Sequence, residues 1–164
     1  MIEKTFPIAE KLLIHGHKAT GKLFELLKAE AEQLGRAADP DVISRIAAEK
    51  KEMVAELDQF TRQFGQVLAT EQLGVGGDGV KSYLVKAKAA GLSVLEAWNL
   101  WRQIVAVSRQ CKAINEQNGA SIVLLSRHTQ RSLQILRGKS PLAATYGPDG
   151  STRSELFSHT LISV

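Results

Sequence analysis

The chain has 164 residues and a net charge of +4; 44% of its residues are hydrophobic and 23% are charged, as in a soluble globular protein with one core. No apolar run approaches the roughly 20 residues of a membrane-spanning helix, so membrane insertion is not expected. The N-terminus lacks the basic stretch and apolar core of a secretion signal, and the single cysteine, Cys111, rules out an internal disulfide. A cytoplasmic protein is therefore predicted.

The first predicted helix covers about residues 5–36, with Thr5 as a candidate N-cap. Gly16 and Gly21 each cost about 1 kcal/mol relative to alanine inside a helix, but the apolar pattern keeps its register across both. One helix with a weak point at 15–21 is therefore expected. Its seam positions alternate in steps of three and four, as in a heptad repeat: Phe6, Ala9, Leu13, Gly16, Thr20, Leu23, Leu27, Glu30 and Leu34.

A second helix is predicted over 40–73, with Asp39 as its N-cap and Pro40 at its first position. The short connection makes the first two helices an antiparallel pair. The seam of the second helix repeats the alternation of the first: Ile43, Ile46, Lys50, Met53, Leu57, Phe60, Phe64, Val67 and Glu71.

A short helix over about 79–90 and a long one over about 93–137, capped by Ser93, complete the predicted elements. Trp98 and Trp101 share one face of the last helix, which favours packing near one end of a bundle over a partner pocket. The predicted fold is all-α: an antiparallel, coiled-coil-like bundle of three long helices and one short helix, followed by an irregular C-terminal tail. The predicted domains are a bundle over 1–138 and a flexible tail over 139–164.

Catalytic, cofactor and metal sites are not predicted. Gly74-x-Gly76-x-x-Gly79 matches a dinucleotide-binding pattern, but a helix rather than a strand precedes it, so a flexible loop is expected. The four histidines, of which His15 and His17 are two residues apart, lack the Glu-x-x-His pairs of a metal site in a helical bundle. Cys111 is expected to be a buried, unreactive thiol. The sequence therefore predicts a protein that is not an enzyme.

Asn115, Asn118 and Gly119 interrupt the last helical pattern with residues of low helix propensity. Buried asparagines can fix the register of packed helices, and a glycine can end a helix. Both interpretations, a polar register pin and a helix break at Gly119, remain open on residue chemistry alone.

Four segments follow one another in an order that has a family counterpart. They are Leu23-x-x-Leu26-Leu27-x-x-Glu30-x-x-x-Leu34, Ile43-x-x-Ile46-x-x-x-Lys50-x-x-Met53-Val54-x-x-Leu57, Asn115-x-x-Asn118-Gly119 followed by His128-x-Gln130-x-x-Leu133-x-x-Leu136, and Tyr146-Gly147-x-Asp149-Gly150. Together they resemble the FlgN-like flagellar synthesis proteins, chaperones of the flagellar type III export system, over about residues 10–150. The helical pieces are weakly specific for the family. The asparagine motif (Asn115, Asn118, Gly119) and the tail motif, at this separation, are more specific.

The resemblance implies a cytoplasmic chaperone that binds hook–filament junction proteins (FlgK and FlgL), prevents their premature assembly and delivers them to the export gate. It makes the C-terminal part the client-binding region and implicates the tail tyrosine in docking to the export-gate protein. The candidate gate-docking residues are Tyr146, Gly147, Asp149 and Gly150. The candidate client-binding residues are the apolar ones of this region: Leu133, Leu136, Leu142, Leu156, Phe157 and Leu161.

Two alternatives remain at this stage. Residues 74–137 carry 9 Lys or Arg against 3 Asp or Glu, so a bundle that binds nucleic acid weakly through a basic 81–137 face is one of them, although the excess is mild. A generic helical-bundle interaction protein with weak self-association is the other.

Deleting residues 139–164 is expected to abolish client or gate binding while changing the melting temperature by no more than a few degrees, because this segment lacks the seam periodicity of the core. Thermal unfolding followed by circular dichroism, together with a pull-down of client protein, checks both parts. A large fall in melting temperature would show instead that the segment belongs to the core.

Overall fold

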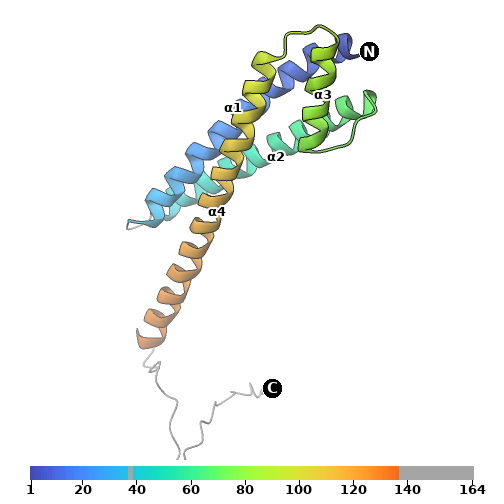
Figure 1. The fold of residues 1–164 in the computed structure, drawn as a ribbon. Coiled ribbons are helices and arrows are strands. Elements are labelled where there is room, and N and C mark those ends of the chain that lie inside the picture. Colours follow the sequence, from blue (N-terminus) through green and yellow to red (C-terminus); the bar gives the residue numbers. More distant parts are fainter. Residues whose placement is uncertain (37–38, 137–164) are drawn as a thin grey trace, which may run out of the picture. The chain divides into compact units, whose positions relative to one another are not determined.

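The computed structural model describes residues 1–36 and 39–136. They form four helices: α1 (Ile2–Leu34), α2 (Pro40–Thr70), α3 (Gly77–Ala89) and α4 (Leu95–Leu136) (Figure 1). Met1–Ser121 make one compact unit, and α4 continues from Ile122 into a second. The described residues contain helices and no strand, which confirms the predicted all-α bundle of three long helices and one short helix. The predicted boundary between 1–138 and 139–164 lies outside the described residues and stays a prediction.

The α1–α2 pair follows the heptad seams. Seven of the nine predicted seam residues of α1 are buried, and Leu23 and Leu34 are partly buried. In the seam of α2, Ile43, Lys50 and Leu57 are partly buried and the other six are buried. Side-chain hydrogen bonds from the start of α1 to the end of α2, and from the end of α1 to the middle of α2, confirm the antiparallel arrangement.

The predicted helix starts are right at one position and wrong at two. The Asp39 carboxylate accepts a hydrogen bond from the Asp41 amide at 2.9 Å, and Pro40 opens α2, as expected. Thr5 is not an N-cap, because α1 begins at Ile2 and the Thr5 side chain is buried inside the bundle. The helical hydrogen bonds of α4 begin at the Val94 carbonyl, which accepts from the Trp98 amide, one residue after the predicted cap at Ser93.

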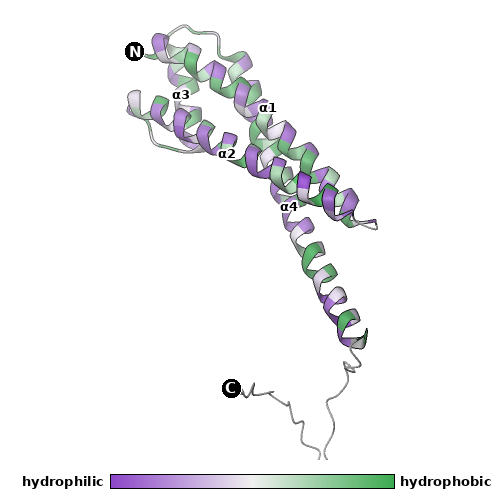
Figure 2. Ribbon diagram, turned by 180° about the vertical axis from the view of Figure 1, so that it is seen from behind, coloured by the Kyte–Doolittle hydropathy of each residue, from purple (hydrophilic) through white to green (hydrophobic). Residues whose placement is uncertain are grey.

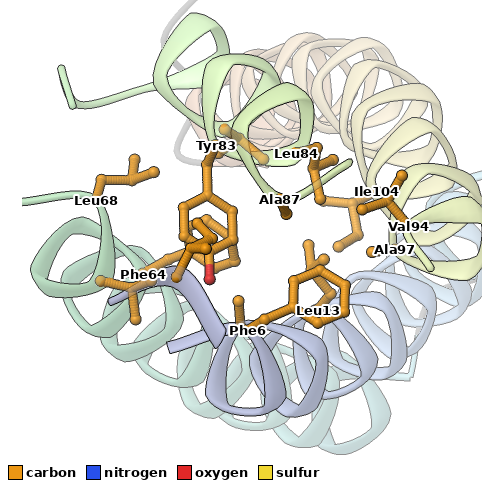
Figure 3. Close-up of a cluster of buried hydrophobic side chains, with 14 of the residues drawn as sticks. Phe6, Leu13, Phe64, Leu68, Tyr83, Leu84, Ala87, Val94, Ala97 and Ile104 are labelled. Carbon is orange, nitrogen blue, oxygen red and sulfur yellow. The ribbon is translucent and has the colours of Figure 1, made fainter. Parts of the chain in front are cut away.

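The core lies where the start of α1, the end of α2, α3 and the start of α4 meet (Figure 3). Tyr83 and Leu84 of α3 and Leu13 of α1 have no exposed surface at all. The Tyr83 ring meets the Phe64 ring edge-on, with 6.1 Å between the ring centroids, a favourable geometry for aromatic pairs. The short helix α3 thus supplies the centre of the core, and both tryptophans of α4 pack against it, as the sequence predicted.

A chain of buried hydrogen bonds crosses the same core. The Thr5 hydroxyl lies 2.9 Å from a Glu71 carboxylate oxygen and 3.0 Å from the Tyr83 hydroxyl. A hydroxyl has one proton, so when Thr5 donates to Glu71 it must accept from Tyr83. The Lys86 ammonium donates to the other Glu71 oxygen at 2.7 Å and, with the Thr5 contact, holds the pKa of this carboxyl below its ordinary value despite its burial. Burial raises the pKa of the Tyr83 phenol.

The predicted weak point at 15–21 is part of a continuous helix, and a neighbouring side chain occupies the space above one of its glycines. A Cβ built on Gly16 would lie 2.8 Å from a ring carbon of Phe60, closer than real Cβ contacts. Gly16 therefore lets the Phe60 ring of α2 approach the α1 backbone. A Cβ at Gly21 would meet nothing within 4 Å, so packing does not require a glycine there.

We expect Gly21→Ala to raise the free energy of unfolding by about 0.5–1 kcal/mol, since alanine loses less backbone entropy in a helix. Gly16→Ala gains the same propensity but must displace the Phe60 ring, and overpacking a core costs about 1–3 kcal/mol. Gly16→Ala should therefore be less stable than Gly21→Ala by at least about 1 kcal/mol in urea unfolding. Equal stabilities would mean that Phe60 does not pack on Gly16.

Candidate partner-binding surface

Asn118 joins α4 to α1 at a buried polar node. Its amide nitrogen donates to the Leu27 carbonyl at 3.0 Å and to a Glu30 carboxylate oxygen at 2.8 Å. Glu30, which is 3% exposed, also accepts two hydrogen bonds of 2.7 Å from the ammonium of Lys50 in α2. One buried carboxylate thus binds side chains from two other helices.

The buried contact of Asn118 decides between the two interpretations of the asparagine motif. Asn118 is a buried polar contact between helices, as the register-pin interpretation predicted, whereas Asn115 is exposed. The alternative of a helix break at Gly119 is wrong, because α4 runs without interruption to Leu136. A Cβ at Gly119 would meet nothing within 4 Å, so the packing of the described residues does not explain this glycine.

The part of α4 from Ile122 onward includes apolar residues, green on the ribbon in Figure 2, and several of their side chains are exposed. Ile122, Val123, Leu124 and Leu125 are 44–56% exposed. Four consecutive residues at 100° per residue point in all directions around a helix. A helical turn that is apolar on all sides is normally buried, so this exposed turn is a candidate binding surface.

The predicted client-binding residues fall into two groups. Leu133 and Leu136 lie on α4, and their side chains are 45% and 82% exposed. The other four and all of the predicted gate-docking residues lie outside the described residues: Leu142, Leu156, Phe157, Leu161, Tyr146, Gly147, Asp149 and Gly150. Their roles remain predictions.

Ile122, Val123, Leu124 and Leu125 are candidate binding residues that the site prediction missed. The available signal was four consecutive apolar residues between Asn118 and the polar stretch 126–132. A helical seam explains only those of them that share its face. In the structure all four side chains are exposed, so all four are candidates.

A hollow between α2 and α4 is a second feature of the compact unit 1–121. It is lined by residues such as Phe60, Trp101 and Val105, and three basic side chains stand along it. Trp101 therefore does more than pack at the bundle end, because its partly buried ring also faces this hollow.

The glycine-rich loop has a steric explanation. Gly76 has φ +89°, in the left-handed region that favours glycine, and a Cβ on Gly79 would overlap the Gly74 carbonyl oxygen. Two of the three glycines that match a dinucleotide-binding pattern are therefore required by a tight turn between two helices, whereas a Cβ at Gly74 would meet nothing within 4 Å.

Other reactive groups of the described residues are dispersed. The His15 imidazole lies 3.9 Å from the Glu56 carboxylate, and no set of three or more metal-ligating side chains gathers in residues 1–36 and 39–136. Cys111 is buried, as expected, and burial raises the pKa of its thiol, which disfavours the reactive thiolate. In the same residues, no helix is both long enough and apolar enough to cross a membrane.

The described residues thus form an all-α bundle with a buried asparagine node and an exposed apolar turn on α4. In a comparison with protein families, the FlgN protein family model matches residues 8–154. The chain belongs to the FlgN family, the family of flagellar export chaperones. Comparisons with curated proteins and with solved structures found no match.

Asn118→Ala should lower the free energy of unfolding by about 1–3 kcal/mol, because the buried Leu27 carbonyl loses its donor and Glu30 loses one of two partners. Asn115→Ala is the matched control, since it removes the same side chain from an exposed position of the same helix. It should be neutral or stabilising by a few tenths of a kcal/mol. Chemical unfolding of both variants makes the comparison, and similar effects would contradict the node.

Proposed function

We propose that this protein is a cytoplasmic, non-enzymatic chaperone that binds hook–filament junction proteins of the FlgK and FlgL type, prevents their premature assembly and delivers them to the flagellar export gate. The family supports the general chaperone role. The observation that carries the proposal is the uncovered apolar part of α4, Ile122–Leu136, which lies within the residues that the family model matches.

The chemistry of this segment fits a helical client. The sequence is apolar at Ile122–Leu125 and again at Leu133 and Leu136, and seven polar residues, 126–132, lie between these two groups. The two apolar groups are about 17 Å apart at 1.5 Å per residue, a distance that three turns of a client helix would span. An amphipathic helix laid along such a surface would cover its apolar residues while its polar face stays in water.

The expected affinity of this segment is modest. Covering one half-exposed leucine or isoleucine contributes about 1 kcal/mol, so six such residues give on the order of 5 kcal/mol. Ordering a client segment costs roughly 2–5 kcal/mol. We therefore infer that further apolar residues add to the complex, and Leu142, Leu156, Phe157 and Leu161 are the candidates. Docking to the export gate is assigned, by resemblance, to Tyr146, Gly147, Asp149 and Gly150.

The ion pairs of the bundle disfavour nucleic acid as the partner. Within the basic face 81–137, Lys81 pairs with Asp78 at 3.0 Å and Lys86 with Glu71 at 2.7 Å. Each pair reduces the positive potential available to phosphates, and a mild excess of 9 Lys or Arg over 3 Asp or Glu in residues 74–137 is far from a Lys/Arg-dense arm.

The test is binding of the C-terminal helical segment of a FlgK-type or FlgL-type protein to the full-length chain by isothermal titration calorimetry. The double variant Leu133→Ser with Leu136→Ser should lose at least about tenfold in affinity, because about 1 kcal/mol of apolar burial is lost at each site. Its melting temperature should not change, since both side chains are exposed.

Ile14→Ser is the matched control. Ile14 is 53% exposed on α1, so the substitution removes a comparable apolar surface at another place. It should leave client affinity within about twofold. Equal losses in the control and the double variant would contradict a client site on α4, and no binding by the unaltered chain would contradict the proposed client class.

A further inference from the structure

The hollow between α2 and α4 lies within the compact unit 1–121 and is called the groove below; the loop 75–77 and Val80 of α3 close its first part, and Thr20 of α1 borders its second. Two adjoining cavities of about 370 and 480 Å³ share Phe60, Thr61 and Trp101 as lining residues. Over the two cavities together, α2 contributes lining residues between Leu57 and Leu68, and α4 contributes them between Trp101 and Lys112. Each of these stretches is twelve residues and about 16 Å long, which is three helical turns.

The floor of the groove is apolar, and small residues keep it open. Phe60, Phe64 and Leu68 form the floor of one cavity, and Leu57, Ile104 and Val105 line the other. Between them Gly65, Thr61 and Ser108 supply little volume, and a Cβ added at Gly65 would meet nothing within 4 Å. A gap of this shape between two antiparallel helices can accept a third helix.

The charged residues along the groove are all basic. Arg62 lines one cavity and Arg109 and Lys112 line the other, whereas neither lining includes Asp or Glu. Arg62 contacts Asp58 at 3.5 Å and Lys112 contacts Glu116 at 4.0 Å, both as exposed pairs within one helix, where the attraction is weak. Arg109 makes no ion pair with the residues of 1–36 and 39–136.

We propose that this groove docks an acidic amphipathic helix of a partner protein, with apolar residues facing Phe60, Trp101 and Val105 and carboxylates facing Arg109 and Lys112. Charge complementarity selects this occupant. A symmetric second copy would bring two basic rims together, and residues 139–164 hold only Asp149 and Glu155 as acidic side chains. The site is separate from Ile122–Leu136 and does not depend on the proposed function.

Two designed helical peptides of about 14 residues, or four turns, are suitable probes. Both carry leucines at positions 1, 4, 8 and 11, flanked by glutamates in one peptide and by lysines in the other. Fluorescence anisotropy of the labelled peptides is measured against the full-length protein. The acidic peptide should bind at least about tenfold more tightly than the basic one, and this preference should shrink as salt is added.

Substitutions in the protein locate the site. Arg109→Glu should weaken the acidic peptide by at least about fivefold, whereas Lys51→Glu, an equal charge change on the exposed face of α2, should change affinity by less than about twofold. Gly65→Leu should block the groove, whereas Gly21→Leu, also at an open helical position, should not. Circular dichroism confirms that all four variants fold.

Equal binding of the two peptides, or an unchanged affinity of Arg109→Glu, would overturn the proposal. Tighter peptide binding after deletion of 137–164 would assign the groove to the chain's own C-terminal residues. A dimer in sedimentation that Gly65→Leu disrupts would assign the groove to a second copy. Either result would also overturn the proposal. Leu133→Ser with Leu136→Ser should bind the acidic peptide normally, so that failure here and failure of the proposed function are distinguishable.

Discussion

The buried Glu30 carboxylate sets the alignment of the helices in this bundle. Heptad seams are degenerate, because sliding α2 along α1 by seven residues would again bring apolar side chains together. Such a slip would move Lys50 away from Glu30, and a buried carboxylate without its partner costs roughly 3–5 kcal/mol. Asn118 extends the same constraint to α4 through a second bond to Glu30. One acidic residue therefore fixes two helix pairs, whereas the apolar seam supplies most of the attraction.

A second polar network fixes the opposite end of α1. Thr5 and Glu71 join α1 to the end of α2, and Tyr83 and Lys86 bring α3 into the same network. The two networks lie 25 residues apart along α1, from Thr5 to Glu30, or about 37 Å at 1.5 Å per residue. Polar contacts at both ends of α1 therefore help to set the spacing between the helices, in addition to the apolar packing of the seam.

The sequence predicts this fold well because its main signal is periodic. Steps of three and four residues located both seams, and the residues at those steps are buried or partly buried. Thr5 was misassigned because a hydroxyl that can cap a helix can equally hydrogen-bond inside a core, and the choice depends on Glu71, which is distant in sequence. Gly16 was expected to weaken α1 because propensity takes no account of Phe60 above it. The groove was not predictable, since its width depends on how closely α2 and α4 approach.

The two candidate surfaces differ in the physical term that would drive binding. Ile122–Leu125 with Leu133 and Leu136 offers apolar area, so a complex there should depend on hydrophobic burial and vary little with salt. The groove adds Arg109 and Lys112 to an apolar floor, so a complex there should associate faster with an acidic partner and weaken in salt. A protein that carries one partner while it contacts another needs surfaces that do not compete for the same ligand. Charge alone does not distinguish the two surfaces, because Ile122–Leu136 also holds Arg127 and Arg131 and no acidic residue. They differ in shape: the groove has an apolar floor with walls beside Arg109 and Lys112, whereas Ile122–Leu125 is an exposed turn of one helix, so the two surfaces favour ligands of different form.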